Sequence, residues 1–243
     1  MENKEFRRQS TPNVHISQAV LVIGSSTSIS GTDPKAVWDT LINTSTWSQW
    51  NSFCPRVTIR EQPTAVDSNN ASAVTPLSPV LQLGTRMTFH VDMDSSTPSY
   101  SAKKRNGSDD TGDQIKRKLR PTSFVVTVFE PPDPSSKEPG RIAWAADPTG
   151  PGGFPPWLHA AERVHEIYKA EEEEGAETEQ DGRTPCERTA RMTTKVRNWE
   201  LQAGWLAYVV RWLFGQVLQR KFEIWVEDLK TFMEEQAEVE GPA

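Results

Sequence analysis

The segment Pro34–Phe53 constrains the fold more than any other part of the chain, because a helix and a tryptophan-rich turn directly follow a predicted strand, Ala19–Ser30. Asp33 can accept hydrogen bonds from the amides of a first helical turn, and Pro34 has no N–H to leave unpaired there. The apolar residues that follow recur at helical spacing and form one face: Val37, Trp38, Leu41 and Ile42. Trp47, Trp50 and Phe53 then form an aromatic cluster, and we expect it to fill a core.

A second, longer amphipathic helix is predicted near the C-terminus. Its apolar residues recur at alternating steps of four and three: Leu218, Phe222, Trp225, Leu229 and Phe232. The polar residues fall mainly on the other side: Gln219, Arg220, Glu223, Glu227, Asp228 and Lys230. Just before this helix, Trp205–Phe214 is apolar nearly all round, so we expect a buried or cavity-closing helical turn there.

Between the two helical regions, predicted strands alternate with polar inserts. The strands after the first are Arg56–Glu61, Gly84–Met93, Ser123–Glu130, Arg141–Ala146, Arg163–Tyr168 and Arg188–Trp199. The longest inserts are Gln62–Pro79, Ser95–Lys118 and the acidic segment Glu171–Gly182. In Gly84–Met93 the residues Met87, Phe89 and Val91 share one face, so the sheet has a dry side that needs apolar cover.

Five short segments, in this order, carry a resemblance to a known family: Val37-Trp38, Trp47–Phe53, Gly84-Thr85, Arg141–Trp144 and Phe222–Met233. Over Ile16–Glu235 the chain resembles the polyketide cyclase and lipid-transfer superfamily, also called START-like or SRPBCC, with the helix-grip fold. The resemblance implies an α+β fold in which a curved antiparallel sheet wraps around a long C-terminal helix and encloses a hydrophobic pocket. We expect a flexible tail over residues 1–15, one helix-grip domain with long loop inserts over 16–236, and a tail over 237–243.

The composition of the chain limits the kinds of molecule that it is expected to bind and the compartment in which it is expected to lie. The formal net charge of -6 and the isoelectric point near 5.4 disfavour nucleic acid, which is bound mainly by clustered Lys and Arg. Cys54 and Cys186 form no C-x-x-C pair, so no zinc or redox motif is expected, while a disulfide between them stays open. The polar N-terminus lacks the apolar core of a signal peptide, and Trp205–Phe214 is too short to span a membrane. We therefore expect a cytoplasmic protein without a transmembrane segment.

One stretch contains ligand-type side chains at regular spacing. His159, Glu162 and His165 form H-x-x-E-x-x-H, which on a helix would gather three metal ligands. The segment is predicted to be a strand, so Glu162 points away from both histidines and no metal site is expected. On that strand Arg163 shares a face with His165, which is a candidate acid or base because its unperturbed pKa is near neutral. An exposed or core-satisfied histidine is the alternative.

In the last predicted strand, the more pocket-like set of alternate residues includes Met192, Thr194 and Asn198. Asn198 is a candidate catalytic residue that would hold a carbonyl or hydroxyl of a ligand, and a turn-capping role is the alternative. The other candidate ligand-binding residues are Met87, Phe89, Val91, Trp144, Arg163, Trp205 and Tyr208. Core packing explains Trp144 and Trp205 equally well. The chain has no nucleophile elbow, Walker loop or dinucleotide fingerprint, so no cofactor is expected.

These observations lead to three functional hypotheses. The first is a cofactor-free enzyme of secondary metabolism, of the cyclase or dehydratase type, that folds a small hydrophobic metabolite in a dry cavity. The second is a non-catalytic carrier of a lipid or other hydrophobic ligand, which needs the same pocket without a positioned acid or base. The third is a protein-interaction module of the cochaperone type, with the acidic segment as its contact.

Overall fold

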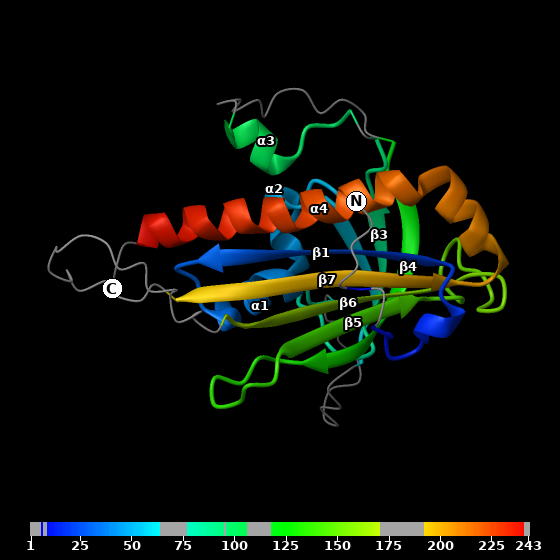
Figure 1. The fold of residues 1–243 in the computed structure, drawn as a ribbon, viewed down its shortest axis with the longest axis horizontal. Helices are drawn as coiled ribbons and strands as arrows, with labels where there is room; N and C mark the ends of the chain where they lie inside the picture. The colour runs from blue at the N-terminus through cyan, green and yellow to red at the C-terminus, as the bar shows by residue number, and fades with distance from the viewer. Residues whose placement is uncertain are drawn as a thin grey trace, which may run out of the picture.

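The computed structural model describes Phe6 and residues 9–63, 77–94, 96–105, 118–170 and 192–240. Within this part of the chain, one antiparallel sheet curves around a long C-terminal helix (Figure 1). Its strands are β1 (Leu21–Ser30), β2 (Arg56–Glu61), β3 (Arg86–Val91), β4 (Arg120–Glu130), β5 (Gly140–Ala146), β6 (Ala160–Lys169) and β7 (Thr193–Ala203). They pair in the order β1-β7-β6-β5-β4-β3-β2. The last strand, β7, therefore lies next to the first, and β1 and β2 form the two edges of the sheet.

The helices occupy the positions that the sequence indicates, with one addition. They are α1 (Pro34–Ile42), α2 (Trp47–Trp50), α3 (Tyr100–Arg105) and α4 (Trp205–Glu240), with 3-10 turns at η2 (Ile16–Gln18) and η3 (Thr44–Thr46). Asp33 caps α1 by accepting the Lys35 backbone N–H at 3.0 Å, as predicted. The predicted α+β helix-grip architecture is confirmed, because α4 runs along β1 and β7 and the sheet curves around it (Figure 1).

The main core lies between the inner face of the sheet and α4. The predicted apolar stripe of α4 is buried throughout: Leu218, Phe222, Trp225, Leu229 and Phe232. Trp47, Trp50 and Phe53 are buried as well and pack into the same core. Burying a large apolar side chain stabilises a fold by about 1.5–3 kcal/mol, so this interface holds α4 in place.

Among the described residues before Ile16, Phe6 and Asn13 pack on the outer face of the sheet, within the range 1–15 where a flexible tail is expected. Phe6 is fully buried and stacks on Trp199 with ring centroids 6.0 Å apart. Gly24 leaves room for this ring, since a Cβ there would lie 2.6 Å from it. Glu162 accepts hydrogen bonds from the backbone N–H and the side-chain amide of Asn13, both at 2.6 Å.

Asp228, which the sequence places on the polar side of α4, is instead fully buried. Its carboxylate accepts hydrogen bonds from the Ser101 backbone N–H at 3.0 Å and from the backbone and hydroxyl of Ser52. Burial raises the pKa of this carboxyl, and these hydrogen bonds oppose the shift. Asp228 therefore connects α3 and the segment that follows α2 to α4. The six residues of α3 fall within the predicted insert Ser95–Lys118 and are too few to show a helical period.

The prediction that Trp205–Phe214 is buried is wrong. Trp205 is 74% exposed, Tyr208 60% and Trp212 84%. The first turns of α4 lie at one end of the molecule and run in a different direction from the rest of the helix (Figure 1). Ala207 is buried, and Val210 and Phe214 pack against the main core, so the uncovered apolar residues of the first turns lie on the other side of the helix.

Candidate ligand-binding site

Two polar residues that the sequence singles out lie side by side on the inner face of the sheet. His165 in β6 is the register partner of Asn198 in β7. The same row continues to Ser25 in β1 and to Ile142 in β5. Cross-strand partners project from the same face, so the imidazole and the carboxamide enter the same part of the core. Both residues are 0% exposed.

Aromatic rings enclose this pair. The His165 ring lies 4.4 Å from the Trp144 ring and 4.8 Å from the Trp225 ring, between centroids. Trp225 belongs to α4 and also contacts Trp50 at 5.7 Å. Phe89 contacts Trp144 edge to face at 5.5 Å. The site is therefore a dry aromatic box whose floor is the sheet and whose roof is α4.

The polar atoms inside this box have no hydrogen-bond partners among the described residues. They are both ring nitrogens of His165, both side-chain polar atoms of Asn198, and the indole N–H groups of Trp144 and Trp50. Leaving a buried donor or acceptor unpaired costs about 1–3 kcal/mol, so most proteins satisfy such groups. A cluster of them in one apolar region marks a place where a second molecule can supply the missing hydrogen bonds.

Burial also sets the protonation state of His165. Its pKa is lowered well below the usual value, first because burial disfavours the charged ring and second because the Arg163 guanidinium is near. The ring is therefore neutral at neutral pH and offers one N–H donor and one lone pair. In this state the ring can offer a hydrogen-bond donor and a lone pair of low basicity, and the role of His165 as an acid or base stays a prediction.

Arg163, a predicted ligand-binding residue, lies on the same face but is already engaged. Its guanidinium forms a buried ion pair with Glu200 at 2.9 Å and lies 4.2 Å above the Phe222 ring. Glu200 also accepts a hydrogen bond from the Gln202 amide at 2.6 Å. Because these charges are paired, the positive charge of Arg163 is neutralised within the protein.

The other predicted ligand-binding residues divide into three groups. Met87 and Phe89 are buried in the same core, and Val91 packs against it partly exposed. Thr194 is fully buried, and its hydroxyl donates to the Thr32 carbonyl oxygen at 2.5 Å. Met192, Trp205 and Tyr208 are exposed and line no part of the aromatic box.

Two members of the box were not among the predicted site residues. Trp50 and Trp225 stand out in the sequence as core aromatics, and the structure places both around His165 or its neighbours. Ser25, beside Asn198, uses its hydroxyl to donate to the Phe222 carbonyl oxygen at 2.8 Å. Local sequence does not reveal whether an indole N–H finds a partner, since partners are set by distant segments.

The histidine-rich motif does not gather ligands. Glu162 lies on the outer face with Asn13 and Thr127, whereas His165 lies on the inner face. Within the described ranges no three His, Cys, Asp or Glu residues are close enough to hold a metal ion. Cys54 is buried, which raises its pKa to about 12, and Cys186 lies outside the described residues together with the acidic segment Glu171–Gly182.

The fold and the site define a helix-grip protein with a buried aromatic and neutral polar centre. No protein-family model matches the chain. It is 35% identical to the oxopyrrolidines biosynthesis cluster protein O of Penicillium oxalicum over 219 residues, which cover 90% of each chain. The chain belongs to the family of that protein.

Solved structures that resemble this one have low sequence identity to it. A hypothetical protein from Helicobacter pylori has a TM-score of 0.54 at 11% identity, with 96% of this chain and 97% of that chain covered. The di-domain ARO/CYC StfQ from the steffimycin biosynthetic pathway has a TM-score of 0.41 at 10% identity, with 90% of this chain and 52% of that chain covered. The first likeness supports the fold alone, and the second is too distant to support a functional conclusion.

Proposed function

We propose that this protein binds a small, neutral, hydrophobic metabolite beneath Trp225 and acts on it as a cofactor-free tailoring enzyme of the cyclase or dehydratase type. The observation that carries the proposal is the buried pair His165 and Asn198, whose side-chain polar atoms have no partners among the described residues. Membership in a family with a biosynthesis-cluster protein supports a role in secondary metabolism.

The box selects for a neutral ligand with polar edges. The imidazole is neutral, Asn198 and the two indoles carry no charge, and Arg163 is paired with Glu200. A charged ligand would lose its hydration without gaining an opposite charge, which is costly in a dry site. The faces of Trp144 and Trp225 favour a flat, conjugated body. Since the rings are in mutual contact, binding includes a displacement of Trp225 or of another ring in the box.

The name of the related Penicillium oxalicum protein narrows the chemical class of the proposed ligand. An oxopyrrolidine is a five-membered lactam, and its amide edge carries one N–H donor beside one carbonyl acceptor. The carboxamide of Asn198 offers the complementary acceptor and donor, and both are unpartnered in the described structure. We infer that Asn198 holds a lactam or a related carbonyl edge of the metabolite.

A cyclisation or a dehydration can begin with removal of a proton from a carbon beside a carbonyl group. The lone pair of His165 would take that proton, and the electrons of the broken C–H bond would move to the carbonyl oxygen. The N–H groups of Asn198 and Trp144 would donate to the resulting enolate. The lowered pKa makes His165 a weak base, so the substrate carbon must be activated by two carbonyl groups. In a cyclisation the enolate carbon would attack a second carbonyl carbon of the same substrate, and protonated His165 would return the proton to the resulting alkoxide. In a dehydration the electrons of the enolate would form a C=C bond and break the bond to a β-hydroxyl, which would take the proton from His165 and leave as water.

The same lowered pKa favours the second candidate, a non-catalytic carrier. A neutral imidazole can position a ligand through hydrogen bonds without accepting its proton. The carrier would use His165 and Asn198 in the same contacts. The two candidates therefore differ in turnover and agree in binding.

Native mass spectrometry of protein purified from its own source organism, followed by denaturing extraction, tests the binding step. We expect a neutral metabolite with the wild-type protein and with Trp199→Phe, which removes an unpartnered indole N–H from the outer face. We expect it to be lost from His165→Phe and Asn198→Leu. An empty wild-type protein, or a metabolite retained by both inner-face variants, would contradict the proposal.

Turnover of the extracted metabolite then separates enzyme from carrier. His165→Gln keeps a donor and an acceptor near the ligand but has no basic nitrogen. An enzyme should convert the compound as wild type and lose conversion in His165→Gln while binding persists. A carrier should bind the compound and leave it unchanged in both proteins.

A further inference from the structure

The first turns of α4 expose an apolar face that the proposed function does not use. Its residues recur at i, i+3, i+4, i+7 and i+8 and so share one side of the helix: Trp205, Tyr208, Val209, Trp212 and Leu213. We call these five residues the α4 stripe. All five are substantially exposed, and Trp212 is 84% exposed. An apolar face of this size on a described surface marks an interaction site.

A second pair of exposed aromatic residues lies beside the α4 stripe. Phe154 and Trp157, in the loop between β5 and β6, are 44% and 70% exposed. The Leu206 backbone N–H donates to the Leu158 carbonyl oxygen at 2.9 Å, so the loop and the start of α4 are joined. Gly204 allows this approach, since its φ is +91° and a Cβ there would lie 2.6 Å from the Leu158 oxygen. The β5–β6 loop and the first turns of α4 lie at the same end of the molecule (Figure 1).

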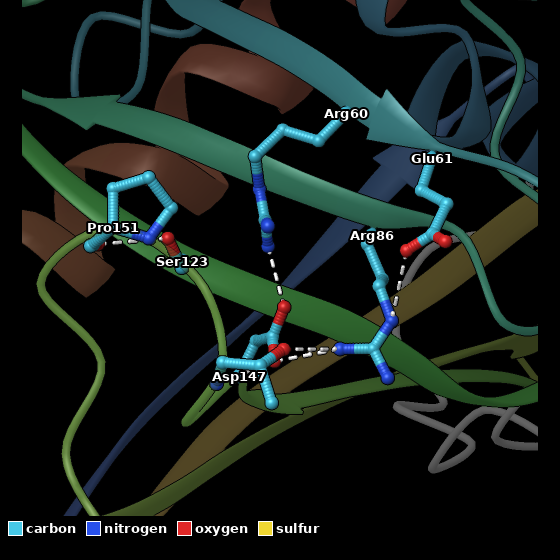
Figure 2. A network of polar contacts seen from close by, with 7 residues as sticks. Arg60, Glu61, Arg86, Ser123, Asp147 and Pro151 are labelled. Atoms are coloured by element: carbon cyan, nitrogen blue, oxygen red, sulfur yellow. Dashed lines mark hydrogen bonds and ion pairs between the residues drawn. The ribbon is translucent and has the colours of Figure 1, made fainter.

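The β5–β6 loop is anchored at its start by the ion pairs of Asp147. This carboxylate binds Arg60 at 2.5 Å and Arg86 at 2.7 Å, as Figure 2 shows. Burial acts to raise its pKa, but hydrogen bonds from Arg60, Thr149 and Arg86 hold it below the usual range. The Ser123 hydroxyl donates to the Pro151 carbonyl oxygen at 2.9 Å and fixes the next turn. Phe154 and Trp157 therefore lie in a loop whose first residues are fixed to the sheet by ion pairs and a hydrogen bond.

The two chain segments that form this surface carry basic side chains and no acidic ones. The segments 149–159 and 204–222 contain no Asp or Glu, although the whole chain has a formal net charge of -6. Arg211 is exposed beside the α4 stripe, and the Arg120 guanidinium lies 5.3 Å from the Phe214 ring. Tyr208, Arg211 and Trp212 also line an open hollow of about 510 Å³ along the first turns of the helix. An anionic group can thus approach a cation while its apolar part contacts the aromatic residues.

We propose that the α4 stripe, together with Phe154 and Trp157, docks on the surface of a lipid bilayer that contains anionic headgroups. Trp and Tyr are favoured at membrane interfaces because each combines an apolar ring with a polar tip. A helix with such residues and flanking Arg lies in the plane of the interface. None of the described helices has the length and apolar content of a membrane span, which fits surface contact. A second copy of the chain would instead bring like charges together.

Co-sedimentation of the full chain with phosphatidylcholine vesicles, with and without phosphatidylserine, tests this proposal. We expect binding to the vesicles that contain phosphatidylserine, weaker binding to phosphatidylcholine alone, and a decrease at high salt. Trp212→Glu should weaken binding by at least about tenfold, which corresponds to the loss of one buried aromatic contact. Val239→Glu, at the exposed far end of the same helix, is the matched control and should bind as wild type.

Two further measurements test whether Trp212→Glu remains folded and whether Trp212 itself contacts the lipid. Unfolding by urea should be the same for Trp212→Glu and the wild type, since the side chain lies on the surface. Quenching of tryptophan fluorescence by brominated lipid should decrease in Trp212→Glu. Absence of vesicle binding, or binding that this variant leaves unchanged, would overturn the proposal. A dimer seen by sedimentation equilibrium and abolished by Trp212→Glu, without vesicle binding, would assign the surface to a second copy.

Discussion

The box beneath Trp225 and the α4 stripe depart from the usual burial pattern in opposite directions. Inside, the polar atoms of His165 and Asn198 are enclosed and have no hydrogen-bond partner in the part of the chain that the structure describes. Outside, Trp205 and Trp212 present their rings to solvent. Buried polar groups normally have partners and large apolar groups are normally covered, so both arrangements cost stability in the isolated chain. We propose that a different second molecule relieves each cost, a ligand with polar edges inside and a lipid surface outside.

The largest expected effect separates two tryptophans of the same helix. Trp225→Ala should lower the free energy of unfolding by about 3–5 kcal/mol, because it empties the roof of the box. Trp212→Ala should change it by less than about 0.5 kcal/mol, because that side chain is exposed. Urea denaturation of both variants measures the difference. An equal decrease in the free energy of unfolding for the two variants would show that Trp212 is packed as tightly as Trp225, and it would contradict the contrast between the box and the α4 stripe.

A medium effect of opposite sign is expected inside the box. His165→Phe replaces both unpartnered nitrogens by carbon and should raise the free energy of unfolding by about 1–3 kcal/mol, while ligand binding is lost. Thermal unfolding without ligand measures the gain. Thr194→Val is the matched control, since its hydroxyl is hydrogen-bonded to Thr32 and its removal should destabilise the protein. A less stable His165→Phe protein would mean that the imidazole has partners in solution.

The smallest expected effect is a dependence of stability on pH. Burial and Arg163 lower the pKa of His165 below its value in the unfolded chain, so the unfolded chain binds a proton more readily. Stability is then fully present above about pH 6.5 and falls as the pH decreases below it, by about 1 kcal/mol between pH 7.5 and pH 5.5. His165→Phe should lose this part of the pH dependence, as measured by urea denaturation at each pH. A slope that the variant retains in full would assign the effect to other groups, such as His90, whose pKa is lowered by burial and by Arg56.

Strand periodicity predicted which residues share the inner face of the site, but it did not predict which of their polar groups have partners. Alternation in β6 places Arg163 and His165 on one face, and alternation in β7 places Thr194 and Asn198 on one face. No sequence pattern indicated that Arg163 is paired with Glu200 while the His165 nitrogens have no hydrogen-bond partner among the described residues. Those outcomes depend on the register between β6 and β7 and on the position of α4, which bring together residues far apart in the sequence.

The sequence by itself determined the order of the elements, the capped start of α1, the apolar stripe of α4 and the alternation of the strands, because these follow from local spacing and backbone chemistry. The tertiary structure alone decided which apolar residues are covered. Trp225 and Trp212 lie on the same helix, yet one lies beneath the helix on the sheet and the other faces solvent. It also decided that Asp228 is buried, since the atoms that satisfy its carboxylate come from Ser52 and Ser101. Burial is a property of the neighbours that a side chain meets, and those neighbours are set by the path of the whole chain.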